Sequence, residues 1–547
     1  MRPRPVSGAR TPLFDALRRA ARLAGAARRP GAPPLDELVA RDREARLARR
    51  RERAEHPSPL VLDRRRFLKL AGAGAAGLAL APSLWGCAST RVPSGARIAV
   101  VGGGMAGLNA AYTLKKAGIA ATIYEASDRT GGRIYTARDL LNPGQTTELG
   151  GEFIDSIHED MLALAAEFSL PLIDRRDETL VEAYFFDGRH YTEDEVVAAF
   201  APLAERILAD YDSTGEIVDY QHEGNATALD NTSIAEYLDL IGAEGFIRAL
   251  LDVAYVTEYG LDAGEQSALN LIFLIGTDLS EGFEIFGESD ERYKIEGGNQ
   301  RVVDALAEAL DGQVQLGQRL VAVRPRGEGY RLTFESGAAT RDVDADVVLL
   351  TLPFTLLRQV DLSGLALPAF KTRAIGELGY GMNAKVFLGT SARPWRAAGY
   401  TAECFTDEAF QLCWDNAQFQ PGEGGGLTLY SGGAAGLAVG EGTPESQVAR
   451  MMPGVERVFP GTEAAFNGRV GRFHWPTHPF TLASYACYRP GQWTTIAGAE
   501  IEPVGNLFFA GEHCSYDYQG YMNGAAETGR RAAEGVLEAL GVMVEAG

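Results

Sequence analysis

The sequence predicts an α/β fold with an additional α+β part, and three observations predict it. A short apolar run, Ile98–Val101, is followed by a glycine-rich turn and then by helical spacing over Ala106–Ala117. A second apolar run, Ala121–Tyr124, follows that helix and ends at an acidic residue, Glu125. Further short apolar runs alternate with helical segments near the C-terminus. Alternation of buried strands and helices in one chain is typical of an α/β sheet.

Chain length and charge limit the classes of protein to be considered. The chain has 547 residues, 46% hydrophobic and 23% charged, which is enough for more than one domain. The formal net charge is −21, and positions 1–70 hold 19 basic and 8 acidic residues, which leaves −32 on positions 71–547. An acidic body repels nucleic acid and favours cationic small molecules, although acidity that only keeps the surface soluble stays an alternative.

The cysteines are few and widely spaced. They are Cys87, Cys404, Cys413, Cys487 and Cys514, and no CxxC pair occurs, so we expect no metal site. Cys404 and Cys413 would face each other across a hairpin and pair if the protein is exported. Free thiols are the simpler expectation.

The remaining elements follow from periodicity and composition. Residues 1–62 are rich in Arg, Ala and Pro, which is typical of a disordered or loosely helical leader. Residues 156–290 show amphipathic helical spacing, and 313–336 alternate like a hairpin. Later segments are a buried strand over 344–353, strands mixed with loops over 380–500, a last buried strand over 505–513 and a final helix over 520–540.

The turn after the first strand has the spacing Gly102-x-Gly104-x-x-Gly107. The first glycine permits a tight turn, the second lets the backbone approach a pyrophosphate, and the third allows close packing of helix on strand. The N-terminus of the next helix supplies partial positive charge. Glu125, at the end of the second strand, can accept hydrogen bonds from ribose hydroxyls. These features predict a Rossmann-like dinucleotide-binding site.

The segment after Glu125 indicates which dinucleotide is bound. It contains Arg129-Thr-Gly131-Gly132-Arg133, and an arginine fork with bare glycine backbone suits a buried diphosphate. This segment resembles the R-x-G-G-R motif of the flavin-containing amine oxidase superfamily, which includes monoamine oxidases, polyamine oxidases and L-amino-acid oxidases. The resemblance implies FAD as the cofactor.

The resemblance extends over residues 97–547. It includes ELGGEFID at 148–155, IEGGNQRVVDAL at 295–306, VVLLTLPFTLL at 347–357 and the closing FFAGEHCSYDYQGYMNGAAETGRRAA at 508–533. It implies that the following residues bind the cofactor: Gly102, Gly104, Met105, Ala106, Gly107, Glu125, Ala126, Arg129, Gly131, Gly132, Arg133, Gly150, Gly151, Glu152, Val321, Gly511, Glu512, Gly520, Tyr521 and Met522.

The superfamily has a Rossmann-like FAD-binding domain interleaved with an α+β substrate domain. On that pattern we expect, after the leader and an export signal over 63–87, FAD-binding segments at 97–175, 291–370 and 501–547 and substrate-domain segments at 176–290 and 371–500.

Three side chains are candidates for catalysis. In monoamine oxidases two tyrosines flank the substrate amine on the flavin face, and the resemblance implies Tyr521 and Tyr485 in these roles, because electron-rich ring faces suit an amine. Lys385 stands where the family has a lysine that reaches flavin N5 through water. Core packing for the tyrosines and a strand-edge position for the lysine are the alternatives. Ser484 cannot form a thioether, so non-covalent FAD is expected.

The substrate class is inferred from one segment. L-amino-acid oxidases carry a carboxylate-binding arginine where this chain has Phe153, with Glu152 and Asp155 beside it. Polyamine oxidases place an acid or histidine near the Asp155 position to attract a distal ammonium. The segment therefore favours an amine or polyamine, although Arg472 or Arg489 would serve a carboxylate, and the two acids would also serve packing alone.

The expected activity is that of an FAD-dependent amine oxidase. Hydride passes from the α-carbon of a primary or secondary mono-, di- or polyamine to the flavin, giving imine or aldehyde, and O2 is reduced to H2O2. An L-amino-acid oxidase is the alternative. A flavin desaturase or protoporphyrinogen-oxidase-like enzyme and a non-catalytic flavin module are further alternatives.

An export signal is expected before the enzyme. Arg64 and Arg65 in DRRRFLK resemble the twin-arginine signal, with Asp63 as a departure at its first position. The export machinery is thus an expected partner, and it would carry a folded enzyme already loaded with FAD. Leu84–Cys87 resembles a lipobox, so a lipid anchor at Cys87 and plain cleavage nearby both stay open. A periplasmic location, free or membrane-anchored, and a homodimer are implied.

Overall fold

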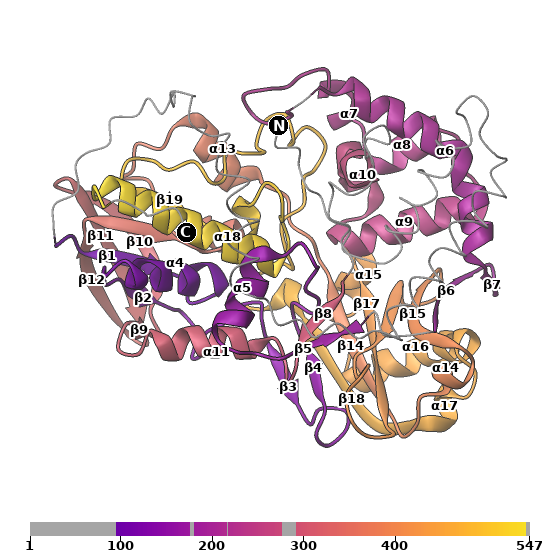
Figure 1. Ribbon diagram of the computed structural model, residues 1–547. Coiled ribbons are helices and arrows are strands. Elements are labelled where there is room, and N and C mark those ends of the chain that lie inside the picture. Colours follow the sequence, from indigo (N-terminus) through magenta and orange to yellow (C-terminus); the bar gives the residue numbers. More distant parts are fainter. Residues whose placement is uncertain (1–94, 176–179, 216, 276–290, 543–547) are drawn as a thin grey trace, which may run out of the picture.

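The computed structural model describes residues 95–542 except 176–179, 216 and 276–290. The predicted leader and export signal lie outside these residues. The described chain forms two parts that lie side by side, one built on a parallel sheet and one on a mixed sheet with a group of helices (Figure 1). This agrees with the predicted fold class.

The parallel sheet has five strands. Across the sheet they are β19 (Leu507–Phe509), β13 (Val347–Leu350), β1 (Ile98–Val101), β2 (Thr122–Tyr124) and β9 (Val314–Gln315). Each neighbouring pair is parallel. Strands β1 and β13 are buried along their whole length, which explains why their sequences are continuous apolar runs.

Each face of the parallel sheet is covered. Helices α4 (Met105–Lys116), α11 (Gln300–Ala309) and α18 (Met522–Ala539) pack on the face that presents Ile98 and Val100. The other face, with Ala99 and Val101, packs against an antiparallel sheet. Its strands are β10 (Arg319–Arg326), β11 (Gly329–Ser336) and β12 (Ala339–Ala345).

The second part is built on a seven-stranded mixed sheet. Its order is β18 (Phe466–His474), β14 (Ala384–Thr390), β17 (Gly425–Ser431), β16 (Leu412–Asp415), β15 (Tyr400–Thr406), β6 (Val181–Phe186) and β7 (Arg189–Tyr191). One face packs on α16 (Pro444–Val458). Above the sheet in Figure 1 stand α6 (Glu193–Ser213), α7 (Thr227–Asp230), α8 (Ile234–Leu240), α9 (Gly245–Tyr259) and α10 (Ala268–Ile275).

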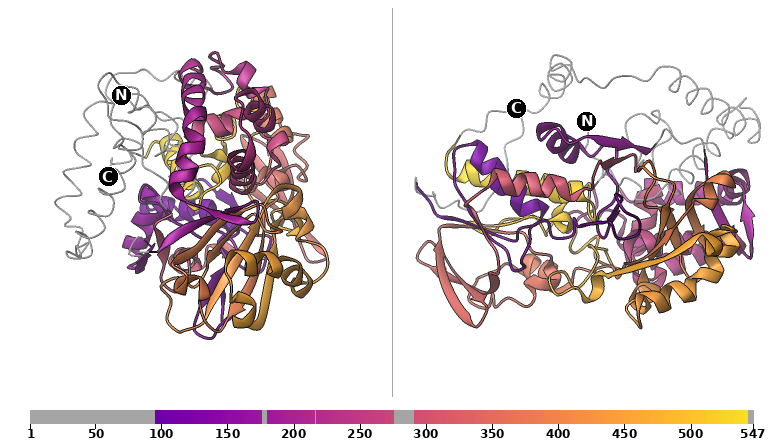
Figure 2. Two further views of the ribbon diagram at one scale, coloured as in Figure 1. Left: turned by 90° about the vertical axis from the view of Figure 1, so that its right-hand side faces the viewer. Right: turned by 90° about the horizontal axis from the view of Figure 1, so that it is seen from below.

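Short elements complete the structure. Two antiparallel ribbons, β3–β4 and β5–β8, lie close to the boundary between the two parts in Figure 1. Figure 2 shows the same ribbon diagram from two further sides. Their bounds, with those of the remaining helices, are β3 (Thr136–Arg138), β4 (Thr146–Glu148), β5 (Leu172–Asp174), β8 (Tyr293–Ile295), α5 (Glu159–Glu167), α12 (Phe354–Leu357), α13 (Ala369–Glu377), α14 (Pro394–Ala397), α15 (Gly433–Ala438) and α17 (Thr462–Ala465).

The structure differs from the sequence prediction over 156–290. That segment is largely helical, as expected, but it also contains three strands, β5, β6 and β7, which were not expected. Strand β6 is parallel to β15, more than 200 residues later, so its partner is invisible to local periodicity. The domain boundaries stay a prediction.

Two further features bear on the sequence analysis. Cys404 and Cys413 are directly opposite each other on β15 and β16, as expected for a hairpin, and both are buried free thiols. Among the helices of the described residues, none combines the length and apolar character needed to span a bilayer.

Candidate active site

A large cavity is lined by residues of both parts of the molecule. Its volume is about 1980 Å³ including the open mouth. The lining extends from the glycine turn after β1 to residues of β14, β15 and β17, so both parts of the molecule contribute to it.

One end of the cavity lies at the carboxyl ends of β1 and β2. Helix α4 begins there with Gly104 as its N-cap and no side chain capping it, so its first N–H groups are available to a ligand. Glu125 follows β2, and its carboxylate accepts hydrogen bonds from Gly103 N at 2.6 Å and Ser127 N at 2.8 Å. A Cβ on Gly107 would lie 2.0 Å from the carbonyl oxygen of Gly102, so only glycine fits where the helix crosses the turn.

The two predicted arginines line this end and are anchored by the protein. The Arg129 guanidinium donates to the carbonyls of Thr130 and Gly132 and lies 3.9 Å from the Tyr135 ring centroid. Arg133 donates from Nη1 to Glu512 Oε1 and to the Ser484 carbonyl, both at 2.7 Å. Both guanidinium groups are therefore fixed before any diphosphate arrives.

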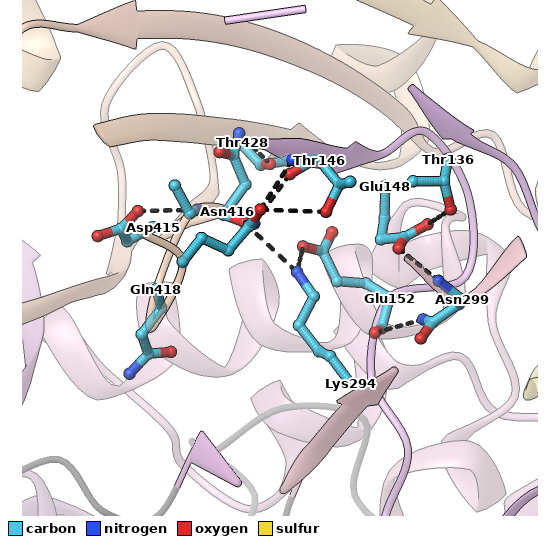
Figure 3. Close-up of polar contacts among 12 residues, drawn as sticks. Thr136, Thr146, Glu148, Glu152, Lys294, Asn299, Asp415, Asn416, Gln418 and Thr428 are labelled. Carbon is cyan, nitrogen blue, oxygen red and sulfur yellow. Dashed lines mark hydrogen bonds and ion pairs between the residues drawn. The ribbon is translucent and has the colours of Figure 1, made fainter. Parts of the chain in front are cut away.

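The middle of the cavity is bordered by the loop Glu148–Glu152, which follows β4. Figure 3 shows how Asn299 holds this loop: its backbone N–H donates to Glu148 Oε1 at 2.8 Å, and its side chain donates to the Glu152 carbonyl at 2.7 Å. Burial raises the pKa of Glu148 to about 7. The loop presents Gly150 and Gly151 to the cavity.

Lys385, the second residue of β14, reaches the same loop. Its Nζ donates to Glu152 Oε2 and the Gly150 carbonyl, both at 2.8 Å, and to the Glu148 carbonyl at 3.2 Å. Lys294 on β8 donates to the other oxygen of Glu152 at 2.8 Å (Figure 3). Burial alone would raise the pKa of Glu152, but the two ammonium groups outweigh it and lower this pKa to about 2.

The predicted tyrosines both line the cavity. The Tyr485 hydroxyl donates to the Thr257 carbonyl at 3.1 Å and lies 2.8 Å from the Tyr430 hydroxyl. The Tyr521 ring packs edge-on against His158, with centroids 5.0 Å apart. These contacts fix the positions of both tyrosine rings in the cavity wall.

His158 is buried and neutral. Its Nδ1 accepts from the Asp155 backbone N–H at 2.9 Å, which leaves the ring proton on Nε2, 3.4 Å from Asp155 Oδ2. Burial lowers the pKa of His158 to about 3.

The far end of the cavity is acidic. Its lining includes four carboxylates, Asp155, Glu258, Glu291 and Glu403. Burial, followed by the neighbouring carboxylate of Glu403, raises the pKa of Glu291 well above its ordinary value, and burial also raises the pKa of Glu403.

Arg175 partly balances this acidic end from outside the lining. Its guanidinium lies 3.4 Å from Glu403 Oε2 and donates to Gln418 Oε1 at 2.9 Å and to the Glu291 carbonyl at 2.8 Å. The donors of Arg175 are therefore engaged by the protein.

Most residues predicted from the sequence meet in this cavity. Of the predicted cofactor-binding and catalytic residues, all but Gly107 and Val321 line it. Val321 is on β10, where its carbonyl accepts from Asp361 N at 2.9 Å. Residues that the sequence analysis missed include Thr257, Glu258, Glu291, Glu403, Leu412, Trp414, Tyr430, Trp475 and His478 in the lining, and Lys294 behind it.

The lining fits FAD. Glycine backbone borders the cavity where a side chain has no room: a Cβ on Gly131 would lie 2.9 Å from the Ile134 carbonyl oxygen, and one on Gly151 would lie 2.7 Å from the Met522 side chain. Uncapped helix ends and fixed arginines suit a diphosphate, and Glu125 suits a ribose. Fold and cavity define a nucleotide-cofactor enzyme with a separate substrate end.

Comparison with known proteins identifies the family. The family profile described as "Flavin containing amine oxidoreductase" matches residues 105–537, and the chain belongs to this family. It is therefore an FAD-dependent oxidoreductase that acts on amines.

Individual relatives agree with this assignment. The chain is 25% identical over 465 residues to a Mycobacterium tuberculosis protein named flavin-containing monoamine oxidase AofH, covering 83% of this chain and 99% of the relative. It is 26% identical to polyamine oxidase 4 of Oryza sativa subsp. japonica, covering 80% and 88%. The solved structure of cyclohexylamine oxidase from Brevibacterium oxydans has a TM-score of 0.72 at 22% identity and covers 82% of this chain and 99% of that one.

Proposed function

We propose that the chain oxidises a di- or polyamine. The observation that carries this proposal is the set of four carboxylates at the far end of the cavity, Asp155, Glu258, Glu291 and Glu403. A second cationic group on the substrate would favour the ionised form of these groups, including Glu291 and Glu403, whose pKa values burial raises. The reacting amine would then lie near the tyrosines. Hydrogen bonds between ionised partners are shorter and stronger than neutral ones.

An amino acid substrate is less well supported. Among the described residues, the arginines that line the cavity are Arg129 and Arg133, at the nucleotide end. Arg472 donates to the carbonyls of Val439, Glu441 and Gly442, and Arg489 pairs with Glu265, so neither is placed to bind a substrate carboxylate there.

We assign the following roles to the chain's own residues. The rings of Tyr485 and Tyr521 orient the reacting amine, and Lys385 supplies a fixed positive charge beside the loop 148–152. Bound FAD supplies the two-electron acceptor. We expect its binding to be non-covalent, because Ser484 carries a hydroxyl that donates to Asn383 Oδ1 at 2.6 Å.

Matched substrates test the proposal. Peroxide release would be measured with 1,6-diaminohexane, 1-aminohexane and L-lysine, together with longer polyamines. A charge-assisted hydrogen bond contributes about 1.5–3 kcal/mol, so kcat/KM for the diamine should exceed that of the monoamine roughly 10- to 100-fold. A higher kcat/KM for 1-aminohexane or L-lysine would reject the diamine. Absence of peroxide with every amine and amino acid would favour the non-catalytic flavin module.

A variant pair adds a structural control. Glu258→Gln should lower kcat/KM for 1,6-diaminohexane and leave that for 1-aminohexane nearly unchanged. Glu408→Gln removes a carboxylate that pairs with Arg457 and does not line the cavity, so it should affect neither substrate.

We also propose that the enzyme is exported in the folded state. The support is the twin-arginine-like DRRRFLK at 63–69, which lies outside the described residues. Mass spectrometry of the mature N-terminus tests it: a start at Cys87 with an added lipid indicates anchoring, a start nearby without lipid indicates cleavage alone, and an intact residue 1 contradicts export.

A further inference from the structure

Lys294 is a buried charged residue that has no role in the catalysis proposed above. It lies on β8, its side chain is 9% exposed, and it is not among the residues that line the cavity. A buried ammonium group is costly unless it is paired. Its partners therefore indicate why the fold keeps it.

Lys294 and Lys385 share one carboxylate. Lys294 Nζ lies 2.8 Å from Glu152 Oε1, and Lys385 Nζ lies 2.8 Å from Glu152 Oε2. The side chains of Lys385 and Glu152 are 6% and 5% exposed. Each carboxylate oxygen of Glu152 thus accepts a hydrogen bond from one lysine, and the two contacts together fix the orientation of the carboxylate.

The arrangement fixes the charge as well as the position of Lys385. Its three N–H donors have three acceptors, namely Glu152 Oε2 and the carbonyls of Gly150 and Glu148, which is the pattern of an ammonium group. The lowered pKa of Glu152 keeps its carboxylate ionised. Within this group of three, two ammonium groups and one carboxylate leave one net positive charge. Glu148, whose pKa burial raises to about 7, adds negative charge beside it only as it ionises.

We infer that Lys294 is a positioning residue for Lys385: by holding Glu152 from behind, it keeps the Lys385 ammonium fixed and leaves a net positive charge next to the bound flavin. Without Lys294 the Glu152–Lys385 pair would be neutral, and Glu152 would be free to turn. The inference rests on the FAD of this family and on the proposed role of Lys385, but not on the substrate.

A positive charge beside the cofactor stabilises its reduced, more negative form. The midpoint potential of bound FAD therefore tests the inference, and it is measured by photoreduction against a reference dye with no amine present. We expect Lys294→Met to lower the potential by about 30 mV, which corresponds to a tenfold change in a two-electron equilibrium. Lys294→Arg, which restores the charge and the contact with Glu152, should stay close to wild type.

Kinetics give a second readout. Lys294→Met should slow anaerobic flavin reduction by amine roughly tenfold and leave KM unchanged within about twofold, because Lys294 does not touch the cavity. If the variant does not retain FAD, Lys294→Gln takes its place, since an amide can still donate to Glu152 without carrying charge.

The matched control is Arg292→Met on the same segment. Arg292 directly precedes β8 and pairs with Asp174 on β5, and neither residue lines the cavity, so this variant loses an ion pair near Lys294 without changing the charge beside Lys385. Its potential should equal that of wild type. An FAD-containing Lys294→Met or Lys294→Gln with an unchanged potential would overturn the inference. The inference would also be overturned if Lys294→Arg lowered the potential as much as Lys294→Met does, because altered packing alone would then explain the lower potential.

Discussion

Tyr521 is the N-cap of α18, and its ring lies between the cavity and His158. If the ring attracts the substrate amine, Tyr521→Leu removes a cation–π contact of about 0.5–2 kcal/mol. We expect kcat/KM for amines to fall roughly 2- to 30-fold in this variant. In Tyr521→Phe, kcat/KM should fall less, because phenylalanine keeps an aromatic ring. Tyr518→Phe is the control, since Tyr518 contacts His158 but does not line the cavity. Peroxide release measures kcat/KM for all three variants. If kcat/KM of Tyr521→Leu equals that of wild type, Tyr521 only packs in the core and does not contact the amine.

His158 makes the stability of the fold sensitive to acid. Its folded pKa of about 3 is below the ordinary 6.5, so the unfolded chain binds the proton more readily between these values. This contribution to stability is therefore fully present above pH 6.5 and is lost as pH falls toward 3, by about 2 kcal/mol at pH 5.

Replacement of His158 tests this dependence. His158→Phe keeps the ring contact with Tyr521 but does not titrate, so its unfolding free energy should depend less on pH between 7 and 5 than that of wild type. Urea unfolding at several pH values measures the difference. His222→Gln, at an exposed histidine, should follow wild type, and a parallel pH dependence for His158→Phe would contradict the assignment.

At the residue scale, the nucleotide end was predictable, whereas only Asp155 of the four carboxylates at the other end was named from the sequence. Gly102, Glu125 and Arg129 have fixed spacing, because a diphosphate and a ribose impose it on one short segment. Glu258 and Glu403 come from α9 and β15, which meet only through the tertiary fold. Carboxylates are frequent in this acidic chain, so nothing local distinguishes these two. The predicted roles of Lys385 and Tyr485 stay predictions.

Helix α4 packs closely on the turn before it because residue 107 is a glycine and has no side chain. Gly107→Ala would place a Cβ 2.0 Å from the Gly102 carbonyl oxygen and push the helix off the turn. We expect a loss of about 1–3 kcal/mol in unfolding free energy, as for other overpacked sites, with release of FAD. Urea unfolding and the flavin absorbance that stays with the protein after gel filtration measure both effects.

Gly376 in α13 supplies the matched control. A Cβ there would meet nothing within 4 Å, so Gly376→Ala should stabilise the protein by about 0.5–1 kcal/mol through helix propensity. Equal responses of the two alanine variants would show that close approach at Gly107 has no special importance.

At the element scale, prediction succeeded where the partners are close in sequence. The strand at Ile98–Val101 agrees with β1, and the predicted Ala106–Ala117 helix is shifted by one residue from α4. The hairpin predicted over 313–336 is also confirmed, because β10 and β11 are antiparallel. Strand β6 was missed because, apart from β7, the strands of its sheet begin at residue 384 or later. Strand β7 was missed with it, because β6 is its partner.

The whole molecule carries a formal net charge of −21, and its proposed substrates are cations. The summed field should concentrate them near the cavity, and salt should weaken this effect as the Debye length falls from about 30 Å at 0.01 M to about 10 Å at 0.1 M. We expect kcat/KM for 1,6-diaminohexane to fall roughly 3- to 10-fold over this range, and that for 1-aminohexane to fall less. A salt response that does not increase with substrate charge would contradict this.

The parallel sheet joins the beginning and the end of the described chain: β1 lies beside β13, β13 beside β19, and α18 packs on α4. Tyr521 and Met522, at the start of α18, complete the cavity. We therefore expect flavin binding to await the synthesis of these residues, after the other strands of the parallel sheet. A product truncated before α18 should be colourless after purification, and a truncated product that keeps its flavin would contradict this.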